Sequence, residues 1–205
     1  MKKTLVVNYT PRIDSNTEKL TNFFLEEYKH KTEIDFLDLA KDAPDLLLNE
    51  NLNLMIKRNF GDVPLSIDET KLLEKNDTMA KQVLNADFIV LSHPMFNFSL
   101  PAAVKAWVDA IIQAGTTFLL TDKGYQGLCN EKKAIVLMTT GNDHGLESEK
   151  PTNLATDLLK SCFGIMGISS SHISAYGMNA YPHKVDAILE KAKQEIKEVC
   201  NEWYK

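Results

Sequence analysis

The sequence predicts an α/β fold, a doubly wound, five-stranded parallel sheet with helices on both faces. Short runs rich in β-branched residues alternate with longer segments of helical period, and this alternation is typical of doubly wound sheets. The short runs are almost continuously apolar, which indicates strands covered on both faces. The chain has 205 residues, and a chain of this size buries roughly 70% of its unfolded surface, enough for one sizeable core.

The five predicted strands lie in residues 4–7, 33–37, 88–91, 134–137 and 171–175. Between them, apolar residues recur at helical spacing in residues 20–28, 72–84, 104–112, 154–166 and 185–203. Pro101 and Gly115 flank the third of these stripes, and proline near the start and glycine past the end are the expected helix boundaries. We interpret all five stripes as helix faces that pack on the sheet.

Two segments fall outside this alternation. Residues 41–66 are the least regular and predict a short helix with a surface excursion. Residues 117–130, with Gly124 and Gly127, predict an insertion or a small hairpin. Because no repeat, low-complexity tract or interdomain linker appears, residues 1–205 are predicted to form a single domain.

Composition excludes several classes of function. The chain carries 23 basic and 28 acidic side chains, a net charge of −5, so it lacks the basic surplus that nucleic acids or anionic membranes attract. Cys129, Cys162 and Cys200 show no C-x-x-C spacing, which argues against a disulfide scaffold, a zinc ribbon or a redox pair. Neither a secretory apolar segment nor a membrane-spanning apolar run is present, so we expect a cytoplasmic protein.

In a doubly wound sheet, ligands bind beyond the carboxyl ends of the strands, where the strand order reverses. The loop after the first predicted strand lacks glycine, so neither G-x-G-x-x-G nor the Walker motif is present. It crowds hydroxyl and amide side chains at a helix start: Thr10, Ser15, Asn16 and Thr17. With free helix N–H groups, these suit a terminal phosphate. Ser15-x-x-Glu18 is also a capping box, which would by itself be enough to explain Ser15. A helix cap and a phosphate site are compatible, because a phosphate can use the N–H groups that the cap leaves free.

The loop after the third predicted strand places two aromatic residues and an amide between Pro94 and Pro101. Its central residues are Met95, Phe96, Asn97 and Phe98. The prolines restrain the backbone, the rings offer a flat apolar wall, and the amide can donate and accept hydrogen bonds. This combination suits a planar heterocycle with a polar edge. The alternative, that the two rings merely cover the end of the sheet, stays open.

The loop after the fourth predicted strand is rich in small polar residues and glycine. It begins with Thr139, Thr140, Gly141 and Asn142. Glycine allows close backbone approach, so this loop could bond a ring edge through backbone amides, or it could be an ordinary exposed loop. For His144, a role as general acid or substrate contact competes with a solvated side chain, and the solvated interpretation is favoured.

No sequence pattern supplies a catalytic or metal-binding side chain. The five histidines form neither H-x-x-x-H nor H-x-E, and no G-x-S-x-G occurs. We therefore predict no metal site and assign no catalytic residue. A phosphate cradle, an aromatic loop and an amide-rich loop at one sheet edge describe a mononucleotide with a flat ring. Flavin mononucleotide (FMN) in a flavodoxin-like sheet is the natural candidate.

Residues 94–101, Pro-Met-Phe-Asn-Phe-Ser-Leu-Pro, resemble the P-M-[YF]-N-F-x-[IL]-[PS] segment of FMN-dependent NADH azoreductases, which are also NAD(P)H:quinone oxidoreductases. The match continues through Lys105, Asp109, Ala114-Gly115, Thr117-Phe118, Thr121, Gly124, Gly127-Leu128, residues 132–136, Pro151-Thr152 and Gly164. It covers essentially the whole chain and is densest in residues 94–136.

The resemblance implies bound FMN, with NADH or NADPH as electron donor and quinones or azo compounds as acceptors in a ping-pong cycle. It implies phosphate contacts from Thr10, Ser15, Asn16 and Thr17, and ring contacts from Met95, Phe96, Asn97, Phe98, Thr139, Thr140, Gly141 and Asn142. Asn97 would lie near the reactive edge of the ring. The family also implies a homodimer with active sites at the subunit interface, so that an exposed Phe118 and residues 117–130 would face the partner.

This chain departs from the family pattern in three places. Relatives often carry S-R-G-G where this chain has residues 139–142, and aromatic residues where it has Leu120 and Cys162. These changes leave the expected cofactor in place and weaken the expected substrate range. The alternative function, from another class, is a flavodoxin-like electron carrier or an FMN-binding module without turnover of its own.

Overall fold

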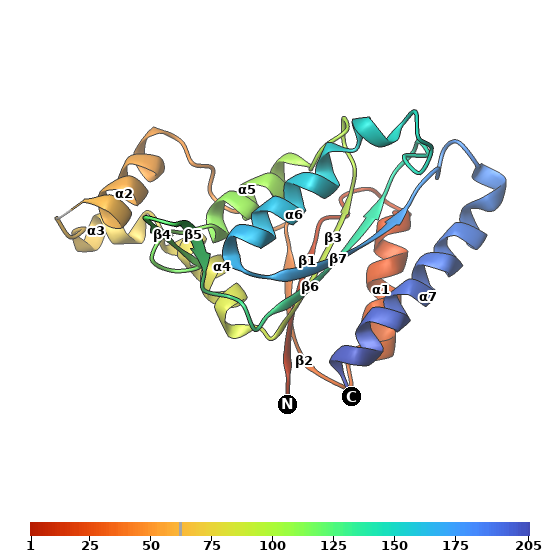
Figure 1. Ribbon diagram of the computed structural model, residues 1–205, viewed down its shortest axis with the longest axis horizontal. Helices are drawn as coiled ribbons and strands as arrows, with labels where there is room; N and C mark the ends of the chain where they lie inside the picture. Colours follow the sequence, from red (N-terminus) through yellow and green to blue (C-terminus); the bar gives the residue numbers. More distant parts are fainter. Residues whose placement is uncertain (62) are drawn as a thin grey trace.

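Five parallel strands form the central sheet, in the order β2-β1-β3-β6-β7. They are β1 (Lys3–Asn8), β2 (Glu33–Asp38), β3 (Phe88–Pro94), β6 (Lys133–Thr139) and β7 (Ser169–Ala175). Figure 1 shows this computed structural model, which describes residues 1–61 and 63–205. The predicted doubly wound parallel sheet is confirmed. The strand order reverses between β1 and β3, because the chain first steps from β1 out to β2.

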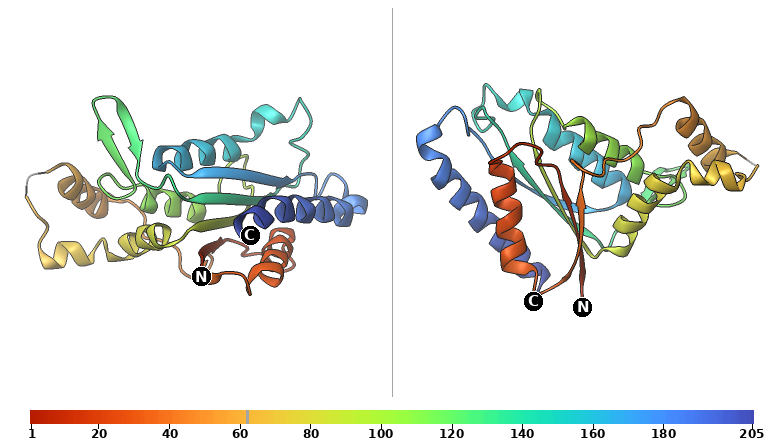
Figure 2. Two further views of the ribbon diagram at one scale, coloured as in Figure 1. Left: turned by 60° about the horizontal axis from the view of Figure 1, so that its bottom comes forward. Right: turned by 180° about the vertical axis from the view of Figure 1, so that it is seen from behind.

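Helices cover both faces of this sheet (Figure 2). One face carries α1 (Asn16–Tyr28) and α7 (Val185–Trp203), which lie side by side. The other face carries α4 (Glu74–Asn85), α5 (Ala102–Ile111) and α6 (Leu154–Met166). Two short 3-10 turns, η1 (Lys150–Thr152) and η2 (Pro182–Lys184), precede α6 and α7. Within residues 1–61 and 63–205, no helix is both long enough and apolar enough to cross a membrane.

The core consists of two layers, one on each face of the sheet. Alternate residues of each inner strand point to opposite layers, so that in β3 Ile89 packs with α4, α5 and α6 while Val90 packs with α1 and α7. Both residues are fully buried. This two-sided burial is the physical reason why the strand sequences are continuously apolar.

Of the irregular segment 41–66, residues 41–61 and 63–66 are described; they leave the sheet and contain the predicted short helix. This helix is α2 (Asn49–Phe60), and a further short helix, α3 (Ile67–Lys71), follows it (Figure 1). A small separate cluster of Leu54, Met55 and Leu73 holds the excursion together. Arg58 of α2 also bonds Asp77 of α4 at 2.6 Å, which ties the excursion to the main body.

Residues 117–130 form a hairpin, as one of the two alternatives predicted. Its antiparallel strands are β4 (Phe118–Thr121) and β5 (Gly124–Gly127), and it stands out from the body (Figure 2). The predicted exposure of Phe118 is wrong: this side chain is half-buried, with its ring 5.6 Å from that of Tyr125. The expected helix end at Gly115 is also wrong. α5 ends at Ile111, and Gly115 adopts a φ of +78° in the turn that enters the hairpin.

Candidate functional site

A pocket of about 220 Å³ opens at the carboxyl edge of the sheet, where β1, β3 and β6 end. It is lined by Pro11, Arg12, Ser15, Asn16, Pro94, Met95, Phe96, Thr139, Thr140, Gly141, Met178 and Asn179. All three loops predicted from the sequence therefore meet at one site, at the reversal of strand order. Five predicted residues do not line the pocket directly: Thr10, Thr17, Asn97, Phe98 and Asn142.

The first loop ends at the N-terminus of α1. Ser15 is the N-cap residue, and its hydroxyl accepts a hydrogen bond from the Glu18 N–H at 3.4 Å. The return bond of a complete capping box is not formed in the described part of the chain, so only half of the predicted box is present. The N–H groups of Asn16 and Thr17 have no acceptor among the described residues. They point outward at the positive end of the helix dipole, an arrangement that binds anions.

Thr10 and Thr17 do not line the pocket and instead form hydrogen bonds beside it. Thr17 is fully buried, and its hydroxyl lies 2.6 Å from that of Thr139, which ties α1 to the end of β6. The Thr10 hydroxyl accepts a hydrogen bond from the Asn8 side chain at 2.9 Å. The phosphate contacts of Thr10 and Thr17 remain predictions; for Thr17, the group free to make one is the backbone N–H. Sequence reasoning missed Arg12, whose exposed side chain also lines the pocket.

The second loop contains a tight turn with unusual backbone angles. Phe96 and Ser99 exchange two backbone hydrogen bonds at 3.1 and 3.0 Å, and the two residues between them have positive φ, +47° at Asn97 and +68° at Phe98. This is the geometry of a type I′ turn, whose second position usually belongs to glycine. A left-handed conformation at a non-glycine residue costs about 1–2 kcal/mol. The Leu154 N–H donates a hydrogen bond to the Phe98 carbonyl at 3.0 Å and helps to hold the turn in this conformation.

The aromatic side chains of this loop stand partly in solvent. Phe96 is 43% exposed and Phe98 is 50% exposed, although Tyr9 packs against the Phe96 ring at 6.2 Å. Phe96 lines the pocket and Phe98 does not, so a ligand-facing role for the two rings stays a prediction. Met95 is held between the loops, because its N–H donates to the Thr139 carbonyl at 2.9 Å.

The third loop is joined to the loop that follows β7. The Thr140 carbonyl accepts the Met178 N–H at 2.9 Å, and the Gly141 carbonyl accepts the Asn179 N–H at 3.0 Å. A Cβ at position 141 would lie 2.7 Å from the side-chain Nδ2 of Asn179, so a larger residue there would require the Asn179 side chain to move. The Gly141 N–H has no acceptor among the described residues and is free for a ligand.

Sequence reasoning did not consider the loop after β7 at all. One signal could have pointed to it: Gly177, two residues past the last predicted strand, indicates a turn, and its φ is indeed +83°.

His144 is buried, so the favoured solvated interpretation was wrong. Its Nδ1 lies 3.0 Å from the Thr152 hydroxyl and 3.2 Å from the Glu149 carbonyl oxygen. Its ring meets that of Phe98 edge-on at 6.4 Å, so the histidine supports the strained turn of the second loop.

His93, at the end of β3, is a second buried histidine. Burial lowers the pKa of His93 from its ordinary 6.5 to about 4, and its Nδ1 lies 3.0 Å from the Pro94 carbonyl oxygen. That distance identifies Nδ1 as the protonated nitrogen, donating to the carbonyl. The histidine beneath the second loop is therefore a neutral structural residue near pH 7.

The strand order and a pocket at its reversal define a protein of the flavodoxin-like class. Comparison with known proteins agrees: a family described by its flavodoxin-like fold matches residues 2–200. FMN-dependent NADH:quinone oxidoreductase 2 of Bacillus cereus is 32% identical over 98% of this chain and 99% of its own length. FMN-dependent NADH:quinone oxidoreductase of Hydrogenovibrio crunogenus is 31% identical over 89% of this chain and 91% of its own.

Solved structures give the same result. An azoreductase from Bacillus anthracis superposes with a TM-score of 0.90 at 27% identity, covering 98% of this chain and 100% of its own. An FMN-dependent NADH-azoreductase from the same species, in complex with FMN, gives 0.88 at 26% identity over the whole of both chains. This chain belongs to the flavodoxin-like family that contains these NADH:quinone oxidoreductases and azoreductases. The resemblance predicted from the sequence is confirmed.

Proposed function

We propose that this chain is an FMN-dependent oxidoreductase that transfers two electrons from NADH to quinones and azo compounds by a ping-pong mechanism. The observation that carries this proposal is the meeting of three loops at one pocket: a helix N-terminus with free N–H groups, an aromatic turn and a glycine amide. These are the parts that a flavin phosphate, a flat ring and a polar ring edge require. We also propose that residues 1–205 form a single FMN-binding domain.

The phosphate end of FMN would lie at the start of α1. The N–H groups of Asn16 and Thr17 and the hydroxyl of Ser15 supply donors, and Arg12 supplies a cation at the rim. Thr140 stands where the family pattern has an arginine. Its hydroxyl donates a hydrogen bond to the Asn142 carbonyl at 2.5 Å within the same loop. Among the described residues that line the pocket, Arg12 is the one with a cationic side chain.

The ring of FMN would lie against Met95, Phe96 and the turn at Asn97 and Phe98, with the Gly141 N–H at its polar edge. FMN, when bound, supplies the hydride-accepting and electron-donating chemistry. The residues of this chain orient the ring, exclude water from one face and stabilise negative charge by donating backbone hydrogen bonds. No side-chain acid is needed for this work, and the buried His93 is uncharged near pH 7.

The shape of the site supports the proposed ping-pong order. The Phe96 ring, which is 43% exposed, lines the pocket, and the half-exposed Phe98 follows it in the same turn. A nicotinamide and a quinone that each stack there cannot be present together, so the donor would leave before the acceptor enters.

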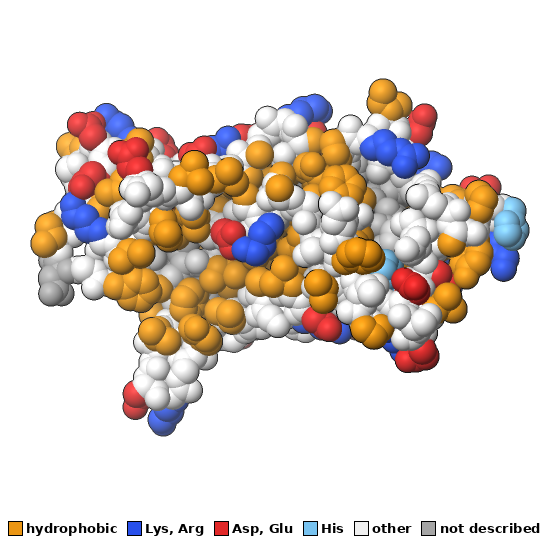
Figure 3. Space-filling view, turned by 90° about the horizontal axis from the view of Figure 1, so that it is seen from above, with side chains coloured by type: hydrophobic (Ala, Val, Ile, Leu, Met, Phe, Trp, Pro, Cys, Tyr) orange, Lys and Arg blue, Asp and Glu red, His pale blue; other side chains and the backbone are white. Residues whose placement is uncertain are grey.

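We further propose that the active unit is a homodimer. Large apolar side chains on and beside the hairpin are exposed: Leu119, Leu120, Tyr125 and Leu128. Figure 3 looks onto the carboxyl edge of the sheet and shows apolar side chains gathered in a broad band on this face. An exposed apolar area of this kind marks an interaction surface, and a second copy of the chain would cover it.

Steady-state kinetics tests the proposal. Initial rates measured against NADH at several fixed quinone concentrations should give parallel double-reciprocal lines. The same pattern with an azo dye would extend the ping-pong order to that acceptor. Intersecting lines would contradict the ping-pong order, and a lack of NADH oxidation with every acceptor would contradict the proposed enzyme activity.

A further inference from the structure

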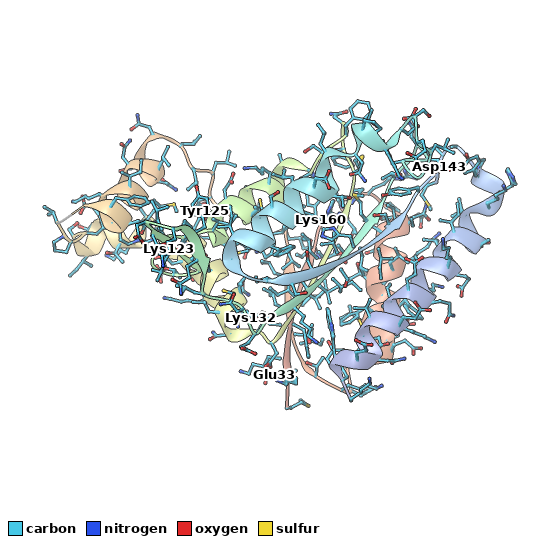
Figure 4. All side chains as sticks on the ribbon, viewed as in Figure 1. Glu33, Lys123, Tyr125, Lys132, Asp143 and Lys160 are labelled. Carbon is cyan, nitrogen blue, oxygen red and sulfur yellow. The ribbon has the colours of Figure 1, made fainter. Side chains whose placement is uncertain are left out.

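A second pocket, of about 440 Å³, lies between α7 and the loops that follow β6 and β7. It is lined by Asp143, Gly145, Ser174, Tyr176, Tyr181, Lys184, Ile188, Lys191, Ala192 and Glu195. Figure 4 shows Asp143 on the loop that faces the start of α7. None of these residues lines the pocket proposed for FMN.

The two pockets share a wall. The loop after β6 and the loop after β7 are joined by backbone hydrogen bonds, including Gly177 N–H to the Asn142 carbonyl at 2.9 Å. Thr140 and Gly141 on this wall face the first pocket, whereas Asp143 and Tyr176 face the second. The second pocket is therefore an immediate neighbour of the proposed flavin site.

Its lining combines an aromatic surface with cations. Tyr176 and Tyr181 contribute two rings, and Ile188 contributes an apolar side chain from α7. The Lys184 ammonium lies 5.3 Å from the centre of the Tyr181 ring and has no carboxylate within 4.0 Å among the described residues. Lys191 is paired only loosely, at 3.8 Å from Glu195, and its side chain is 80% exposed. Such a surface suits a planar aromatic ring that carries an anionic group.

The carboxylate of Asp143 adds a third kind of contact. It accepts the Gly145 N–H at 2.9 Å through one oxygen. A carboxylate in a loop that follows a parallel strand can accept hydrogen bonds from ribose hydroxyls. An aromatic ring, a ribose and a phosphate are the three parts of a nucleotide. A dinucleotide consists of two nucleotides joined by a pyrophosphate, so its two halves need two neighbouring sites.

We propose that this pocket binds an adenine nucleotide, namely the adenosine phosphate half of NADH, while the nicotinamide lies over the flavin. The inference rests on the function proposed above. The adenine ring packs against Tyr176 and Tyr181, the ribose faces Asp143, and Lys184 and Lys191 bind phosphate oxygens.

The test compares two electron donors on the FMN-loaded enzyme. NADH and reduced nicotinamide mononucleotide carry the same reacting ring, but only NADH carries the adenosine. In the double variant Lys184→Ala/Lys191→Ala, the Kd for NADH in the anaerobic reductive half-reaction should rise on the order of tenfold, since charged hydrogen bonds are lost. The Kd for the mononucleotide should stay unchanged. Lys184→Arg/Lys191→Arg should restore NADH binding, and Lys193→Ala, which removes a lysine of α7 that bonds Glu190, should change neither donor.

Inhibition by adenosine 5′-monophosphate (AMP) gives an independent result. AMP should compete with NADH and not with the mononucleotide, and the double alanine variant should lose this inhibition. Equal effects on both donors, no effect on either, or AMP binding without competition against NADH would each overturn the assignment. Failure of NADH to reduce the enzyme at all would overturn the proposed function and this inference together. Reduction with unaltered donor preference would overturn the inference alone.

Discussion

Backbone strain is concentrated beside the candidate site. Among the described residues, the non-glycine positions with positive φ are Asp14, Asn97 and Phe98, and all three belong to loops that form the pocket. Strain of this kind persists only where surrounding contacts hold it, and here the Leu154 N–H and the His144 ring do so. We infer that the turn at Asn97 is kept strained because it presents its N–H groups and the Phe98 ring to the ligand.

Substitutions at Asn97 separate the backbone of this turn from its side chain. Asn97→Val should destabilise the protein by about 1–2 kcal/mol, because a β-branched residue resists positive φ, and it should lower FMN occupancy. Asn97→Gly should leave the free energy of unfolding within about 1 kcal/mol of wild type, because glycine tolerates positive φ. Denaturant unfolding and flavin absorbance measure both effects. Unchanged occupancy in the valine variant would remove the second loop from the proposed site.

His93 predicts a pH dependence of stability. Its pKa in the folded protein, about 4, lies below the ordinary 6.5 because the ring is buried. The unfolded chain therefore binds more protons between these values, so the stability contribution is present above pH 6.5 and is lost as the pH falls toward 4. The free energy of unfolding should decrease over this window, and His93→Gln should make the decrease shallower. Identical slopes in the two proteins would show that His93 does not titrate as described.

At the scale of single elements, the N-terminus of α1 has a cap that stabilises the helix and a proposed phosphate site, and substitutions can separate the two. Ser15→Asp keeps a good N-cap residue but places a carboxylate where the phosphate would bind. Its FMN-free form should be as stable as wild type, whereas its FMN affinity should fall strongly. Ser15→Ala should instead lose about 1 kcal/mol of stability through the missing cap. If Ser15→Asp binds FMN like wild type, the phosphate does not lie at this helix.

The hairpin depends on close packing of β5 against α6. A Cβ at Gly127 would collide with the backbone of Met166 and Gly167, which cannot yield as a side chain would. Gly127→Ala should therefore lower the free energy of unfolding by about 1–3 kcal/mol. Gly164→Ala is the matched control on α6, because nothing lies within 4 Å of its added Cβ. Better helix propensity should leave it as stable as wild type or up to about 1 kcal/mol more stable. Equal stability of the two variants would contradict this packing.

Elements were more predictable from the sequence than the contacts between them. The five strands and five main helices follow from apolar periodicity, which depends only on burial of one or two faces. The burial of Thr17 and His144 could not be predicted in this way, since it depends on how distant loops close over one another. The loop after β7 joined the site through backbone hydrogen bonds to Gly141, and such bonds leave no pattern in side-chain chemistry.

At the scale of the whole molecule, the exposed apolar hairpin predicts self-association. Leu120 is 61% exposed near the hairpin turn, so Leu120→Glu would place a charge in the proposed subunit interface. Sedimentation velocity should show a dimer for wild type and a shift toward monomer for this variant. Leu84→Glu, on α4 at 36% exposure, should remain a dimer. A monomeric wild-type protein would contradict the proposed dimer.

The proposed activity requires one FMN molecule per chain at the carboxyl edge of the sheet. The most direct measurement is an anaerobic titration of the purified, FMN-reconstituted protein, followed by its visible flavin absorbance. We predict one FMN per chain after removal of excess cofactor, bleaching by one equivalent of NADH and recovery of the colour with one equivalent of quinone. Protein that stays colourless after reconstitution, or a flavin that NADH does not bleach, would contradict the account.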